Sequence, residues 1–163
     1  MGDGLATSYT CARDLFEAAR DASIDRDAAA DQLRKMDARR FSTARRTDGT
    51  PSARTPTDGS GASVAFLDFE KAARRRIAED DELLRLATAV LFGREGAGGA
   101  ASLVPARNAD VVFQRYVAAL QWNKVAAVCG VSPATAKRMA AEVFDVVDAY
   151  GVERVVEGVG VAV

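Results

Sequence analysis

The stretch that decides the fold is WNKVAAVCGVSPATAKRM, Trp122–Met139. Small Ala126 precedes Gly130 by one helical turn, and a glycine readily adopts the positive φ that ends a helix sharply. Ser132 is suited to cap a second helix, and Pro133 fits the first turn of that helix because no backbone N–H is needed there. The spacing therefore predicts two helices that cross closely at a small residue and are joined by a tight turn.

This pattern is typical of a helix-turn-helix, whose second helix lies in the DNA major groove. We expect the second helix over 132–149, with Ala136 and Met139 pointing back at the first helix. The residues expected to contact the phosphate backbone, at the start of the first helix, are Asn123 and Lys124. Those expected to face the groove are Ser132, Pro133, Ala134, Thr135, Lys137 and Arg138. A purely structural corner of two helices is the alternative, and we interpret Trp122 as part of the core rather than as a DNA wedge.

Charge limits how this unit can bind DNA. The chain has 163 residues and a net charge of −1, so any nucleic-acid binding must use local patches rather than a global field. Residues 107–150 hold five basic and four acidic side chains, a net charge of +1. We therefore expect one copy to bind weakly and with strong salt dependence, and tight binding to need two copies or a partner such as RNA polymerase.

Several other function classes find no support in the sequence. There is no histidine, and Cys11 and Cys129 lack a C-x-x-C partner, so we expect no metal, no cofactor and no enzymatic activity. We interpret the acidic run 79–82 as solvated surface, because carboxylates spread over a helical turn do not converge on one ion. The N-terminus has no apolar signal segment and no run approaches a membrane span of about 18 residues, so we expect a cytoplasmic protein with no membrane contact.

The remaining chain divides into helical and loop segments. Apolar residues at three- and four-residue steps predict a long helix in 1–46, from about Ser8, and a second long helix in 63–93. Between them, 47–62 is rich in Gly, Pro, Ser and Thr and is expected to be a flexible linker. A loop over 94–107 leads to the helix-turn-helix domain, 108–151, in which Asn108 caps a helix over 109–120. The tail, 152–163, is expected to form a short docking turn or an edge strand.

The fold class we predict is all-α, with an antiparallel pair of long N-terminal helices followed by a C-terminal helix-turn-helix domain. Two apolar stripes mark the long helices, and neither is satisfied by one partner alone, so we expect a homo-oligomer through these helices. The first stripe comprises Leu15, Ala18, Ala19, Ala22, Ala29, Leu33 and Met36, and the second Phe66, Phe69, Ala73, Ile77, Leu84, Ala87 and Leu91. The basic clusters Arg39/Arg40/Arg45/Arg46 and Arg74–Arg76 are interpreted as solvated faces.

The segment FQRYVAALQWNKVAAVCGVSPATAKRMAAEVFDVVD, 113–148, resembles the C-terminal unit of phage-encoded ArpU/RinA-like late-transcription regulators and, more broadly, region 4 of sigma-70 factors. The resemblance implies an all-α fold and a phage or prophage regulator of late genes. Gln121 stands where that family often has Ser or Thr, and the second helix is less basic than in the family. The matching residues are Arg115, Tyr116, Val117, Leu120, Trp122, Val125, Ala126, Gly130, Val131, Ser132, Thr135, Ala136 and Arg138.

Two other functions stay open at this point. Phage small terminase subunits, which recognise packaging sites on DNA, share a similar helix-turn-helix joined to a helical oligomerisation part. A helical protein-interaction module is the other alternative, because the low net charge of residues 107–150 also permits docking on a protein.

Overall fold

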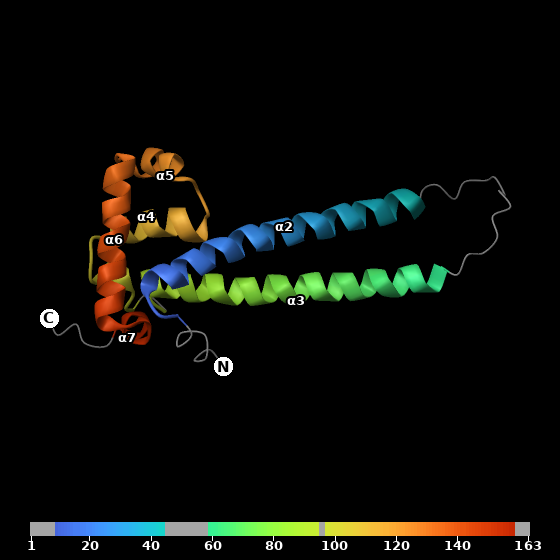
Figure 1. Ribbon diagram of the computed structural model, residues 1–163, viewed down its shortest axis with the longest axis horizontal. Coiled ribbons are helices and arrows are strands. Elements are labelled where there is room, and N and C mark those ends of the chain that lie inside the picture. Colours follow the sequence, from blue (N-terminus) through green and yellow to red (C-terminus); the bar gives the residue numbers. More distant parts are fainter. Residues whose placement is uncertain (1–8, 45–58, 95–96, 159–163) are drawn as a thin grey trace. The chain divides into compact units, whose positions relative to one another are not determined.

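A computed structural model describes residues 9–44, 59–94 and 97–158, and these residues form helices joined by turns (Figure 1). The predicted all-α class and the antiparallel pair of long helices are confirmed. No helix within the described ranges is long and apolar enough to cross a bilayer. The helices are α2 (Ala12–Ala44), α3 (Gly59–Phe92), the 3₁₀ turn η1 (Ala100–Ser102), α4 (Ala106–Val112), the π-helical turn η2 (Phe113–Val117), α5 (Trp122–Cys129), α6 (Pro133–Tyr150) and α7 (Val152–Glu157).

Some boundaries differ from those predicted. Helix α2 begins at Ala12 rather than near Ser8, and α3 begins at Gly59, so residues 59–62 of the expected linker are helical. The remainder of that linker lies outside the described residues. The tail begins with the helix α7 and not with an edge strand, while its last residues, 159–163, are also outside the described part.

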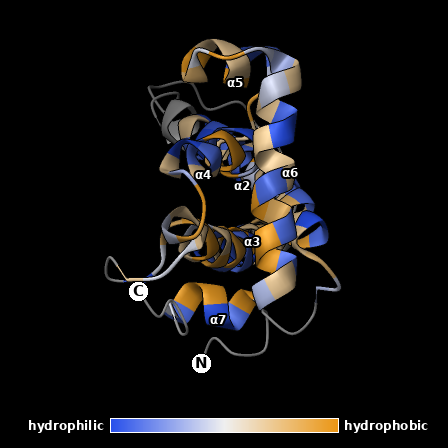
Figure 2. Cartoon of the chain, turned by 90° about the vertical axis from the view of Figure 1, so that its left-hand side faces the viewer, coloured by the Kyte–Doolittle hydropathy of each residue, from blue (hydrophilic) through white to orange (hydrophobic). Residues whose placement is uncertain are grey.

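The chain divides into two units, and the first comprises the described residues of 1–24 and 80–163. Its core joins the start of α2 and the end of α3 to all the later helices. Phe16 of α2 is fully buried there, with its ring centroid 5.5 Å from that of Phe144 and 6.1 Å from that of Tyr116. Within this unit, α5 lies at one end of α6 and α7 at the other (Figures 1 and 2). Residues 108–151, predicted as a domain, therefore do not hold the whole core of this unit, because α2 completes it.

Two glycines allow α7 to dock closely on the loop after α3. Gly98 and Gly99 have φ of 77° and 81°, a region that favours glycine. The N–H of Gly99 donates to the carbonyl of Val155 at 2.7 Å. A Cβ on Gly98 would lie 2.6 Å from the carbonyl oxygen of Val156, so a side chain there would push the helix away.

The second unit, Asp25–Glu79, consists of the remaining parts of α2 and α3. Its described residues bury little apolar surface, since Ala29 and Ala73 are the apolar residues classed as buried among them, and each is still 8% exposed. Phe69 of the predicted stripe is 45% exposed, so the partner helix does not cover it. The Arg74–Arg76 cluster is exposed and each of its residues forms an ion pair, Arg76 with Asp25 of the facing helix at 3.8 Å, as expected of a solvated face.

Candidate nucleic-acid interface

The turn between α5 and α6 has the predicted geometry. Gly130 has φ 62° and ψ 39°, the left-handed conformation that ends α5. The N–H of Val131 donates to the carbonyl of Ala126 at 3.0 Å, and the N–H of Gly130 donates to that of Ala127 at 3.4 Å. These two bonds make a Schellman motif, which satisfies the last carbonyls of the helix.

The start of α6 is capped as predicted. Ser132 is extended, with φ −75° and ψ 154°, and its Oγ accepts the N–H of Thr135 at 3.1 Å. The Thr135 hydroxyl also lies 2.8 Å from Ser132 Oγ, so this cap engages both side chains. Pro133 occupies the first turn of the helix, where its missing N–H costs nothing. The helix then runs to Tyr150, where Gly151, at φ 82°, ends it.

The predicted contact residues lie in the first turn of α5 and in the N-terminal half of α6, and most of them are exposed. Ala136 and Met139 are buried against the core, as predicted. Lys137 is exposed, but its Nζ lies 5.9 Å from the centroid of the Trp122 ring. Arg138 forms no hydrogen bond or ion pair with any described residue, so its guanidinium is available on the outer face of α6. The predicted residues that are exposed are Asn123, Lys124, Ser132, Pro133, Ala134, Lys137 and Arg138, while Thr135 is half-buried.

The connection that precedes α5 differs from the expected continuous helix over 109–120. Helix α4 ends at Val112 and the chain continues as the π turn η2. Ala119 then adopts φ 53°, an uncommon conformation for a residue with a Cβ. Nη1 of Arg115 donates to the carbonyl of Leu120 at 2.8 Å, which closes this wide turn.

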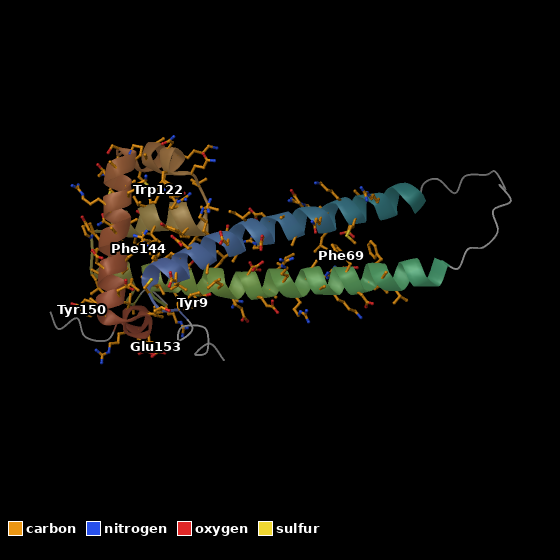
Figure 3. The ribbon with its side chains drawn as sticks, viewed as in Figure 1. Tyr9, Phe69, Trp122, Phe144, Tyr150 and Glu153 are labelled. Carbon is orange, nitrogen blue, oxygen red and sulfur yellow. The ribbon has the colours of Figure 1, made fainter. Side chains whose placement is uncertain are left out.

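Trp122 packs against the core, as predicted, at the start of α5 (Figure 3). Its ring meets that of Tyr116 edge to face with centroids 6.2 Å apart. The Arg115 guanidinium carbon lies 5.1 Å from the Trp122 centroid, within the range of a cation–π interaction. Arg115 and Lys137 therefore fix the orientation of the indole from two different elements.

Arg107 has a role that the sequence reasoning missed. Its guanidinium donates to the carbonyl of Cys129 and, at 3.3 Å, to that of Gly130. A cation at the C-terminus of α5 also suits the helix dipole. Burial raises the pKa of the Cys129 thiol, Asp110 raises it further, and Arg107 opposes both effects. Arg107 thus stabilises the turn itself, and this role has no signature in the local sequence.

Two of the three acidic residues of α6 have structural partners. Glu142 accepts a hydrogen bond from the buried Asn108 side chain at 2.7 Å. The predicted capping role of Asn108 is therefore wrong, because α4 begins at Ala106 and the amide links α4 to α6. Asp148 Oδ1 accepts the N–H of Ala12 at 2.6 Å, which places a carboxylate at the N-terminus of α2. Asp145 is exposed and forms no such bond with the described residues.

The described residues contain no group of three or more Cys, Asp or Glu side chains placed to hold a metal ion. No family model matches this sequence, and no curated protein or solved structure matches it either. The function must therefore be argued from the α5–α6 unit and its surroundings.

Proposed function

We propose that α5 and α6 form a helix-turn-helix that binds double-stranded DNA, with the N-terminal half of α6 in the major groove. The observation that carries the proposal is the exposed start of α6, held by the Schellman turn at Gly130 and the Ser132 cap. Ala134 and Arg138 are one turn apart on the outer face and contribute nothing to the core. A guanidinium at such a position can bind guanine O6 and N7 with two hydrogen bonds.

The remaining contacts in this proposal are to phosphates. Lys124 and Asn123 are exposed in the first turn of α5 and suit the DNA backbone. The Ser132 hydroxyl and the Pro133 and Ala134 surface lie at the N-terminus of α6, where the helix dipole favours an anion. The Thr135 hydroxyl is already bonded to Ser132, so its first role is in the cap. Contact of Thr135 with a thymine methyl group is its second role in this proposal.

The resemblance to phage late-transcription regulators supports a role in transcription control. In this proposal a second copy supplies the affinity that the low charge of one unit does not. The second unit is the part that would supply such association, because Val64 and Leu67, which lie one turn apart on α3, are 57% and 46% exposed. Apolar side chains of that size on a thin helical pair are typical of an association surface.

The experiment is fluorescence anisotropy of a labelled random duplex, titrated with the full chain at about 50 and 200 mM salt, the range in which phosphate contacts are visible. We expect binding that falls steeply with salt. Arg138→Ala should weaken binding to a selected site by about 1–3 kcal/mol and relax specificity at one base pair. Arg85→Ala is the matched control, because Arg85 is equally exposed but lies on α3.

Equal affinities of the Arg138 and Arg85 variants for every duplex would overturn the assigned role of Arg138. Absence of binding by a folded protein at both salt concentrations would instead support the protein-interaction alternative. Light scattering separates regulation from packaging, because a monomer or dimer fits a regulator and a closed ring of many copies fits a small terminase.

A further inference from the structure

A groove of about 640 Å³ lies beside α6, and Lys137 is the one predicted DNA-contact residue among those that line it. Its walls come from the first turns of α2, from η2 and the start of α5, and from the middle of α6, all within the first unit. Trp122 and Phe144, two of its aromatic residues, are seen in Figure 3. The third is Tyr116, whose ring packs between them at 6.2 and 5.6 Å.

Four cations line this groove: Arg13, Arg20, Arg115 and Lys137. Nε of Arg20 and Nε of Arg115 are both buried, and neither has a hydrogen-bond partner among the described residues. Burying a charged donor without a partner is costly. Each guanidinium has a partner through Nη1, Arg115 with the Leu120 carbonyl and Arg20 with Asp21, so an anionic acceptor in the groove would complete a partial set of bonds.

Two carboxylates, Glu17 and Asp21, also line the groove and leave it with a net charge of +2. Both lie in exposed positions, and the Asp21 side chain is 77% exposed while that of Arg20 is 30% exposed. The ion pair between Arg20 and Asp21 is long, with Nη1 of Arg20 3.9 Å from Oδ1 of Asp21. Solvent therefore screens the carboxylates more strongly than the half-buried guanidiniums.

Three of the four cations lie over aromatic rings before any ligand arrives. The Arg115 guanidinium lies 5.1 Å from the Trp122 centroid, and the Arg13 guanidinium lies 5.7 Å from that of Phe144. Lys137 covers the Trp122 ring at 5.9 Å. Because these side chains are already ordered, an anion that binds them loses little of its affinity to side-chain entropy.

We propose that this groove binds a phosphate group. Guanidiniums present a planar fork that matches phosphate oxygens, and a net charge of +2 suits an anion that carries up to two negative charges. The phosphate comes either from the DNA backbone beside α6, which rests on the proposed function, or from a free phosphate compound.

The test uses the intrinsic fluorescence of the full chain, since Trp122 is its single tryptophan and lies in the groove. Inorganic phosphate is titrated at constant ionic strength against sodium chloride. We expect a saturable change in Trp122 emission. Arg20→Gln, which keeps most of the side-chain stem, should raise the apparent Kd by about tenfold, the effect of one lost charged hydrogen bond. Arg20→Lys should restore part of the affinity, and Arg85→Gln should leave it unchanged.

Phosphate that gives no more change than chloride, or equal Kd values for the Arg20→Gln and Arg85→Gln variants, would overturn the proposal. Should Arg20→Gln lose its helical spectrum, Arg13→Gln takes its place, since Arg13 is exposed.

The same variants, measured in the DNA anisotropy assay, identify whether the bound phosphate belongs to the DNA backbone or to a free compound. A salt slope for DNA that is lower by about one in Arg20→Gln supports the DNA backbone. Phosphate binding that weakens while DNA binding stays equal to that of the control supports a free phosphate compound. If the unsubstituted chain gives no phosphate response while its Arg138-dependent DNA binding is intact, the groove proposal is refuted and the proposed function stands.

Discussion

Replacement of Phe16 by alanine tests whether α2 completes the core around α6. Phe16 is fully buried, and its ring contacts those of Tyr116 and Phe144 with centroids 6.1 and 5.5 Å apart. Truncation of a buried phenylalanine costs about 3–5 kcal/mol, and two lost aromatic pairs place this site in the upper part of that range. Domains are stable by only about 5–15 kcal/mol, so the variant should lose about a quarter of its stability or more.

Urea unfolding followed by Trp122 emission measures this effect, because Trp122 lies in the same unit. With a slope of about 2 kcal/mol/M, the midpoint should fall by roughly 2 M. Phe69→Ala is the matched control, since Phe69 is 45% exposed and belongs to the other unit. For Phe69→Ala, the free energy of unfolding measured from Trp122 emission should stay within about 0.5 kcal/mol of that of the unsubstituted protein. Equal midpoints for the two variants would refute the place of Phe16 in this core.

Three further predictions concern the turns, the α2 N-terminus and pH. Gly130→Ala should lower the free energy of unfolding by about 1–2 kcal/mol through backbone strain alone, because the added Cβ meets only Arg107 Nη2 at 3.5 Å. Ala119→Gly should raise it by about 0.5–1 kcal/mol, because Ala119 has a positive φ. Unfolding midpoints that move the other way would contradict both predictions. Asp148→Ala should cost about 1–2 kcal/mol by removing the acceptor of the Ala12 N–H, while Asp145→Ala costs nothing measurable, and equal losses would exclude the capping role. Burial raises the pKa of the Tyr116 phenol, so at alkaline pH the folded state keeps the proton that the unfolded state loses. The free energy of unfolding should therefore fall as pH rises above the ordinary phenol pKa. If urea titrations show an equal fall for Tyr116→Phe, Tyr116 is not the cause.

The turn was predictable because its chemistry is local. Gly130 and Ser132 act within a few residues of their own position, so their spacing alone indicates a left-handed helix end and a cap. The long helices were predictable for a similar reason, since a helical period of apolar residues extends over many turns.

The core of the first unit was not predictable, because its contacts connect distant parts of the chain. Phe16 is an aromatic residue on a long alanine-rich helix, and nothing near it in sequence indicates that it packs against Phe144. Asn108 has the composition of a helix cap, yet its amide bonds Glu142 on another helix. Local propensity gives way in both cases to a partner that only the folded chain supplies.

Helix α6 divides two tasks between its buried face and its exposed face. Its C-terminal half uses Phe144, Val147 and Asp148 to hold the core and the start of α2. Its N-terminal half exposes Ala134 and Arg138, which neither the core nor any described ion pair requires. A substitution at Arg138 should therefore change binding at constant stability, whereas one at Phe144 should change both. This separation allows affinity measurements on α6 variants to be interpreted as contacts rather than as unfolding.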